Sequence, residues 1–350
     1  MSAFRNLRKF TLRAEDDDGF ADMGEVRTVL DENEGTLRHL VLGAYLARTH
    51  SWDSTFQSMT INNLTHLDLV DTRISHVVLA RIAHAHRLQS LTLHGTFEEP
   101  TSASVVFGSD HLIDGKHTFL PHLEAFRFVL VGHDDQLGLY QSVVQFLRQR
   151  TGLKRLDLGS CPWELVLSVL PDLRNLRVLG VRIANVTSHA IAALVGALPK
   201  AMCAIHVSTV TSERDMVSYF FCLCLLFLMS LQHEYARDFL PFHSLSFLHF
   251  HCTSKRRPKP NLMSDKDFEV QSRQWYGHAR SVAEALPSLD FVGWHGEHYV
   301  VVRNGKILDL RELPARRRLD CGKGVDLGTE EAAWLERKDV PMDYETPGLE

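Results

Sequence analysis

The sequence lacks several features that mark large classes of protein. It has six cysteines among 350 residues and no Cys-x-x-Cys pair, so neither a dense disulfide framework nor a paired-thiol site is expected. The longest strongly apolar run, 219–231, has 13 residues, fewer than the roughly 20 that a membrane-spanning helix needs. The first residues contain no apolar core of signal-peptide length. These absences favour the cytoplasm or nucleus and argue against a membrane protein.

A strong excess of either charge is also missing. The formal net charge is −5 at pH 7, and 45% of the residues are hydrophobic and 23% charged, as in globular proteins. No general attraction to nucleic acid is expected from this balance. The basic run 255–260 (KRRPKP) is typical of a solvated loop, with a nuclear import signal as the alternative.

A short sequence motif, Leu-x-x-Leu-x-Leu, recurs along the whole chain. The clearest copies begin at Leu37, Leu64, Leu88 and Leu153, and looser copies begin at residues 7, 123, 176, 202, 245 and 289. The last two apolar positions of each copy alternate as in a short β-strand. One such strand cannot bury its apolar face alone, so stacked neighbours, a solenoid, are predicted.

The spacing of the copies predicts what lies between the strands. Seven of the nine intervals are 23–35 residues long, near the length of leucine-rich repeats and long enough for a helix in each. Apolar periodicity predicts helices over 74–86, 136–149, 188–198 and 268–286, with Ser75 capping the first and Thr187 or Ser188 the third. We therefore expect an α/β leucine-rich-repeat solenoid, with a curved parallel sheet on the concave side and helices on the convex side.

The interval between the eighth and ninth copies contains an anomalous apolar insert, 217–232. Removing these 16 residues shortens the interval from 43 to 27 residues. Val217-Ser218 and Leu231-Gln232 can be encoded by the consensus edges of an intron, which leads to the hypothesis of a translated retained intron. The alternative is a buried helix inserted in a long repeat.

Three regions follow from this pattern. The solenoid is expected over 1–298. Apolar runs on both sides of Asn304-Gly305 predict a β-hairpin over 299–312, which would cover the last apolar layer of the solenoid. Residues 313–350 carry few apolar side chains and are expected to form a loosely ordered tail.

The residues between the repeat leucines should line the concave face of the sheet. Neighbouring strands lie about 4.8 Å apart, so these side chains would form a continuous ladder. Arginine and aromatic residues, which dominate protein-binding hot spots, occur among them. The candidate binding residues are Arg13, His39, His66, Asp68, His94, Arg127, Arg155, Asp157, Arg182, Phe247, His249, His251, Phe291 and His295.

Other kinds of site are weakly supported by the sequence. His249 and His251 would share a strand face, but Cys252 would point away, and His295-x-x-His298 lacks the order of a metalloprotease motif. The segment GKGVDLG, from Gly322, is no phosphate-binding loop, and no nucleophile motif is present. We expect no catalytic residues, no metal and no cofactor, and hence a protein that is not an enzyme.

The long irregular repeats, the Leu-Pro-x-Leu phrases at 120–123 and 286–289 and the terminal hairpin resemble the repeat region of fungal-type F-box/leucine-rich-repeat proteins. The resemblance implies that the repeats hold a substrate while an F-box docks onto the cullin adaptor of a ubiquitin ligase. The first repeat begins at Leu7, which leaves no room for an F-box within this chain. Only Cys161 clearly fills the Asn/Cys position that follows the strand in regular repeats.

Two functions are therefore expected. The first is a non-catalytic recognition module that binds a protein on its concave face, and the substrate-binding region of an F-box receptor if an F-box precedes Met1. The second is a scaffold or structural interaction protein with no link to ubiquitin transfer. Neither requires a membrane or a specific nucleic acid.

Overall fold

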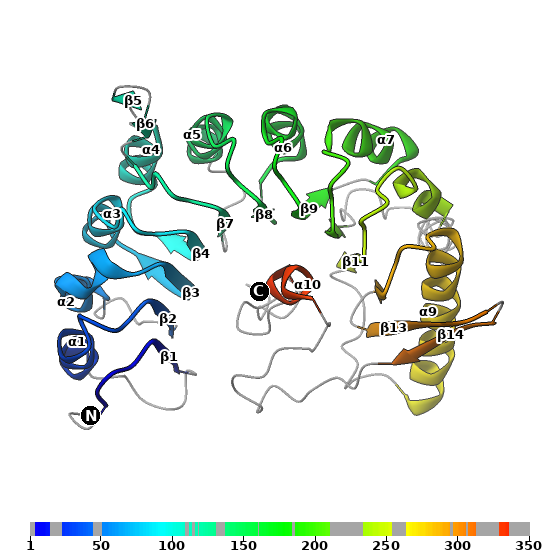
Figure 1. Ribbon diagram of the computed structural model, residues 1–350, viewed down its shortest axis with the longest axis horizontal. Helices are drawn as coiled ribbons and strands as arrows, with labels where there is room; N and C mark the ends of the chain where they lie inside the picture. Colours follow the sequence, from blue (N-terminus) through cyan, green and yellow to red (C-terminus); the bar gives the residue numbers. More distant parts are fainter. Residues whose placement is uncertain are drawn as a thin grey trace. The chain divides into compact units, whose positions relative to one another are not determined.

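A computed structural model gives the arrangement of the elements (Figure 1). It describes residues 4–14, 23–44, 51–108, 112–113, 116–117, 119–130, 137–159, 161–183, 186–210, 234–253, 264–294, 297–305, 307–312 and 329–335. The chain divides into two compact units, 1–174 and 175–348, and the boundary lies inside the predicted solenoid 1–298.

The first unit contains parallel strands that pair in chain order. They are β1 (Lys9–Ala14), β2 (His39–Ala44), β3 (His66–Ile74), β4 (Ser90–Phe97), β7 (Ala125–Leu130) and β8 (Arg155–Leu158). Each pairs in parallel with the next. The short strands β5 (Leu112–Ile113) and β6 (Lys116–His117) form a separate antiparallel pair.

Helices connect these strands and cover one face of the sheet. They are α1 (Met23–Glu32), α2 (Asp53–Phe56), η1 (Met59–Asn63), α3 (His76–Ala83), α4 (Pro100–Gly108), α5 (Leu137–Arg148), α6 (Trp163–Val169) and η2 (Leu170–Asp172). A parallel connection needs such a crossover because each strand must begin again at the same end of the sheet.

The second unit continues the pattern and ends differently. Strands β9 (Val178–Ile183), β10 (Ala204–Val210), β11 (Phe247–Thr253) and β12 (Phe291–Trp294) are parallel. Strands β13 (Glu297–Asn304) and β14 (Ile307–Glu312) are antiparallel additions at the end of the sheet. The helices are α7 (Ser188–Ala197), η4 (Glu234–Phe239), α9 (Asp265–Ala285) and α10 (Glu330–Leu335).

The predicted α/β class and the strand of every repeat copy are confirmed. The repeat leucines point away from solvent, and Leu64, Leu67 and Leu69 are all fully buried. This burial is the main force that holds one repeat to the next. The predicted helices are present, and hydroxyl caps start two of them: Ser75 Oγ accepts from Val78 N, and Thr187 Oγ1 accepts from Ala190 N.

Buried polar side chains tie successive repeats together. Arg150 donates to the main-chain oxygens of Leu120, at 2.9 Å, and of Phe119, and its guanidinium lies 4.4 Å from the centre of the Phe146 ring. Trp52 Nε1 donates to the hydroxyl of Thr72 at 2.7 Å. Thr72 stands where regular repeats carry Asn or Cys, so a tryptophan from the preceding connection satisfies this buried position.

Strands β3 and β4 do not keep one register along their length. Their pairing shifts between Leu69 and Thr72, and Asp71 has a positive φ of 50°. Gly95 lies against this bulge: a Cβ atom added there would be 1.9 Å from the main-chain oxygen of Thr72. Only glycine permits the two backbones to approach this closely.

The predicted terminal hairpin is present. Asn304 pairs with Ile307 across a two-residue loop, and Gly305 in that loop has a φ of +61°, a conformation that glycine adopts without strain. In the predicted tail 313–350, the structure differs from the expectation at 329–335, where α10 is helical and buries Ala332, Trp334 and Leu335. The insert 217–232 and the basic run 255–260 lie outside the described residues.

No helix within the described ranges combines the length and apolar character needed to cross a bilayer.

Candidate functional site: the concave face

In-register pairing of parallel strands arranges the concave-face residues in rows. The concave face is the sheet face that carries the residues between the repeat leucines. In the first unit, one row is His39, His66, Ser90, Ala125 and Arg155, and the next is Val41, Asp68, Thr92, Arg127 and Asp157. Side chains along a row are direct neighbours.

At one end of these rows, His39 contacts a buried carboxylate and lies beside the ring of His66. His39 Nε2 lies 2.9 Å from Oδ2 of Asp68, which is 1% exposed. The ring centres of His39 and His66 are 5.1 Å apart, and Nδ1 of His66 lies 2.9 Å from the hydroxyl of Thr65. A buried carboxylate needs such a partner because burial removes its hydration.

Further along the same strands, His94 contacts the bulge of β3. Its Nδ1 lies 3.1 Å from Oδ1 of Asp71 and 3.4 Å from the main-chain nitrogen of the same residue. The bulge directs Asp71 toward β4, and His94 is buried beside it.

At the other end of the first unit, an ion pair joins the last two strands. Arg127 Nε lies 2.8 Å from Oδ2 of Asp157, and Arg127 is 2% exposed. A buried arginine costs free energy unless a carboxylate compensates it, and Asp157 does so from the adjacent strand. Arg155 lies half-buried in the neighbouring row.

In the second unit, one row consists only of histidine and glycine residues. Strand pairing sets Gly180, His206, His249, Gly293 and His298 side by side across β9 to β13. The rings of His206 and His249 have centres 4.4 Å apart, and those of His249 and His298 are 4.9 Å apart. A Cβ atom on Gly293 would lie 2.4 Å from Cγ of His249, so the His249 ring occupies the space that a larger residue would fill.

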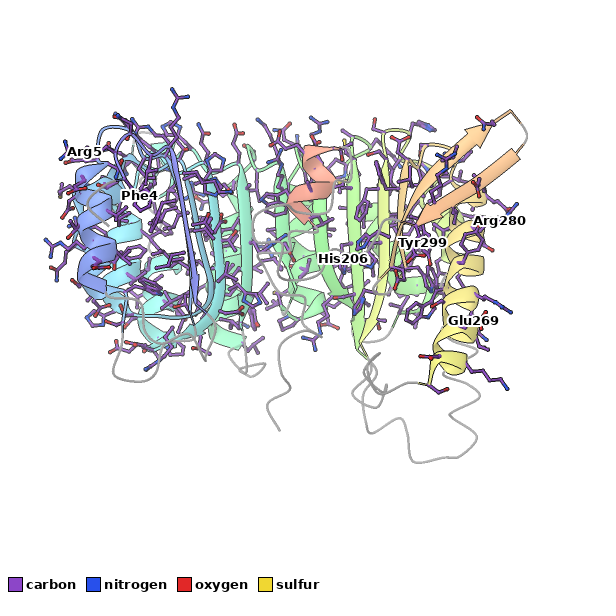
Figure 2. All side chains as sticks on the ribbon, turned by 90° about the horizontal axis from the view of Figure 1, so that it is seen from below. Phe4, Arg5, His206, Glu269, Arg280 and Tyr299 are labelled. Atoms are coloured by element: carbon purple, nitrogen blue, oxygen red, sulfur yellow. The ribbon has the colours of Figure 1, made fainter. Side chains whose placement is uncertain are left out.

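Further aromatic side chains surround this row. Phe247 stacks on His298, with ring centres 6.2 Å apart and planes 13° apart. His251 lies 6.3 Å from His206 and 5.9 Å from His249, measured between ring centres. Figure 2 shows His206 on its strand and Tyr299 beside α9, where Tyr299 makes an edge contact with Tyr276.

A carboxyl pair lies beside His298 at the hairpin. Burial raises the pKa of Glu297, and the hydrogen-bonded carboxylate of Glu312 raises this pKa further, while His298 acts to lower it. Burial also raises the pKa of the neighbouring Tyr299 hydroxyl. The end of the sheet therefore makes Glu297 harder to ionise than a carboxyl group in water.

The histidine row does not form a metal site. Within the part of the chain that the structure describes, no group of three or more His, Cys, Asp or Glu side chains could hold a metal ion. The rings instead make tilted and edge-on contacts with one another. What the face offers chemically is hydrogen bonding, charge of both signs and aromatic surface.

The predicted binding residues are less exposed to solvent than strand alternation alone predicts. Asp68, His94, Arg127, Phe247, His249 and His251 are buried, while His39, His66, Arg155, Asp157, Arg182 and Phe291 are half-buried. The reason is lateral packing: wide side chains on closely spaced strands cover one another. The side chain of Arg13 and the whole of His295 lie outside the described residues.

Two members of the histidine row, His206 and His298, were not among the predicted binding residues. The alternation rule that identifies His249 also places His206 on this face, so the sequence contained that signal. The place of His298 could not be read from the sequence in this way. It reaches the row from an antiparallel strand, and the repeat motif does not specify the register of that strand.

Comparison of the sequence with protein-family models and with curated proteins finds no match. The functional argument therefore depends on the fold and on the chemistry of the concave face.

Proposed function

We propose that this chain is a non-catalytic recognition module that binds a protein partner through its concave face, in the cytoplasm or nucleus. The observation that carries the proposal is the in-register arrangement of charged and aromatic side chains in rows. Their positions are fixed by cross-strand pairs such as Arg127–Asp157 and His39–Asp68. Fixed side chains lose little conformational entropy on binding, which favours affinity.

The chemistry of the face suits a protein ligand. Arginine, histidine and aspartate all occur in the rows, so both signs of charge are present, and the half-buried Phe291 adds aromatic surface. Such mixed surfaces with arginine and aromatic anchors are typical of protein interfaces. A polyanion such as nucleic acid would instead require a continuous basic surface.

A finer proposal is that the module is the substrate-binding region of an F-box-type ubiquitin-ligase receptor. The irregular long repeats and the terminal hairpin support it. Full-length transcript sequencing across the locus tests it: an upstream in-frame F-box, followed by co-purification of the cullin adaptor, would support the receptor. A transcript that starts at Met1 would favour the alternative, a repeat scaffold unrelated to ubiquitin transfer.

The general proposal is tested by reversing charge on one face at a time. Arg155→Glu alters the concave face, and Arg148→Glu places the same change on the exposed side of α5, where Arg148 is 43% exposed. Proteins captured from cell extract by the two variants and by the unaltered chain are compared by quantitative mass spectrometry. Each candidate partner is then purified and titrated calorimetrically.

We expect Arg155→Glu to weaken binding of a true partner about tenfold or more, and Arg148→Glu to change it less than about twofold. Partners that respond equally to both variants, or to neither, would contradict binding by the concave face. Circular dichroism and thermal melts verify that both variants are folded.

A further inference from the structure

Helix α10 lies on the concave side of β9 and β10, opposite α7 (Figure 1). It buries Ala332, Trp334 and Leu335 and leaves Glu330 exposed. All of these elements belong to the second unit. A segment from the far end of the sequence thus occupies part of the surface to which we assign partner binding.

Three positions on the two strands beneath α10 carry small or medium-sized residues, and His206 of β10 lies beside them, paired with Gly180. Val178 and Gly180 on β9 and Ala204 on β10 form a floor, and both Val178 and Ala204 are fully buried. On β11 the residue paired with Ala204 is Phe247. The small side chains allow a helix to approach the sheet closely, and the larger ones on β11 form a wall at one side.

An ion pair fixes the orientation of α10 on this floor. A terminal nitrogen of Arg177, just before β9, lies 3.6 Å from Oε1 of Glu331. The same arginine donates to Sγ of Cys203 at 3.3 Å, so it is itself held at the start of β9 and β10. The contact is thus acidic at the first turn of the helix and apolar at Trp334 and Leu335.

Helix α10 is too short to be stable by itself. It has six residues, whereas isolated helices shorter than about 12 residues are marginal in water. Thr329 caps it, with Oγ1 accepting from Ala332 N at 3.2 Å, but one cap is too weak to hold a single helical turn in water. Its order therefore depends on burial of its apolar side against the floor.

We propose that the floor formed by β9 and β10 is a docking site for a short acidic helix of a protein partner, and that α10 occupies this site until the partner displaces it. The recognised segment has acidic residues in its first turn, followed by two small residues and an aromatic–aliphatic pair, as Glu330 to Leu335 do. This inference rests on the proposed function and names the kind of partner that the second unit takes.

The competition between α10 and a partner helix can be estimated, because α10 belongs to the same chain as its site. A tethered segment acts at an effective concentration on the order of millimolar, so it can occupy its site with weak intrinsic affinity. A partner helix must exceed this competition, and weakening α10 should make the site available to it.

The probe is a fluorescein-labelled peptide with the sequence of residues 328–338, followed by anisotropy on titration with the full chain. We expect Trp334→Ala in the chain, which loosens α10, to bind the peptide about tenfold or more tightly than the unaltered chain does. The matched control is Leu240→Ala, which truncates an exposed leucine away from this floor and should leave the peptide affinity unchanged.

A charge reversal tests whether the peptide binds at the place that α10 occupies. In the Trp334→Ala background, Arg177→Glu should weaken the peptide about fivefold or more, and a peptide carrying Glu331→Arg should recover most of that loss. Arg177 is 50% exposed, so its replacement leaves the core intact. Recovery of affinity by the Glu331→Arg peptide requires direct contact between residue 331 of the peptide and residue 177 of the chain.

Three outcomes would overturn the inference. Equal peptide affinity for the unaltered and Trp334→Ala chains would mean that α10 does not compete for the site, and no binding to any folded variant would mean that the floor is not a docking site. A chain that is dimeric by light scattering and becomes monomeric with Trp334→Ala would mean that a second copy supplies the helix. The response of captured partners to Arg155→Glu is a separate readout, so the proposed function can stand if this inference fails.

Discussion

The guanidinium of Arg303 on β13 donates to the main-chain oxygen of Leu286, just past the end of α9, at 3.1 Å. The same side chain donates to the main-chain oxygens of Ala283, at 3.0 Å, and Leu289. The last carbonyls of a helix have no partner within it, and here an arginine from the terminal hairpin supplies three hydrogen bonds. The hairpin is thereby attached to the final repeat.

Removing this attachment should destabilise the end of the second unit. We expect Arg303→Leu to lower the free energy of unfolding by about 1–2 kcal/mol, because three carbonyls lose a charged donor that is partly open to water. Arg303→Lys should recover only part of this, since an ammonium group cannot reach all three. Urea denaturation followed by circular dichroism measures the change. The exposed Arg311→Leu on β14 is the control, and an equal loss there would contradict the role of Arg303.

Two glycine substitutions should change the free energy of unfolding in opposite directions. Gly95→Ala should lower the free energy of unfolding by about 2 kcal/mol or more, because the added Cβ would lie 1.9 Å from the Thr72 oxygen. Gly196→Ala, on the exposed side of α7 with no atom near the added Cβ, should raise it by about 0.5–1 kcal/mol. Thermal melts of the two variants suffice, and a neutral Gly95→Ala would contradict the close approach at the bulge.

The carboxyl pair at the hairpin predicts a pH-dependent stability. Because the pKa of Glu297 is raised in the folded chain, the folded state binds this proton more tightly than the unfolded state does. Its contribution to stability is therefore greatest at low pH and falls as the pH rises above the ordinary carboxyl range.

Glu297→Gln should remove that loss. We expect its melting temperature to exceed that of the unaltered chain at pH 7, with the difference shrinking as the pH falls through the ordinary carboxyl range. Differential scanning calorimetry across this range measures it. The exposed Glu34→Gln is the matched control, and a gain for Glu297→Gln that is constant with pH would exclude ionisation of Glu297 as its cause.

Cys161 should be chemically inert in the folded chain. Burial raises the pKa of its thiol to about 12, and the thiolate is the reactive form. We expect iodoacetamide to modify it roughly a hundredfold or more slowly at pH 7.5 than after denaturation. Peptide mass spectrometry follows the modification, and rapid labelling of the folded protein would mean that the repeat opens readily around this residue.

The repeat strands were predictable because their signal is local. Each Leu-x-x-Leu-x-Leu copy sets which residues face the core, so Leu67 and Leu69 could be placed without knowledge of their neighbours. Asn304-Gly305 predicted the hairpin for the same reason, since the turn chemistry lies within four residues. The caps Ser75 and Thr187 follow from the first turn of their own helices.

Features that depend on distant partners could not be predicted. The bulge at Asp71 needs Gly95 on the next strand, and the inclusion of His298 in the histidine row needs the register of β13. Helix α10 has too few residues to show a period, and its burial depends on the small side chains of Gly180 and Ala204, more than a hundred residues earlier. Lateral packing also buried candidate residues such as Asp68 that strand alternation alone placed in solvent.

The neighbouring positions Gly293 and His249 bear on how this protein can change in evolution. The imidazole occupies the volume that a side chain at residue 293 would need, so a larger residue there is tolerated only after His249 has become smaller. Substitutions at these two positions should therefore be accepted in a fixed order. Homologous chains with a larger residue at 293 are therefore expected to carry a smaller one at 249, whereas glycine at 293 is compatible with either.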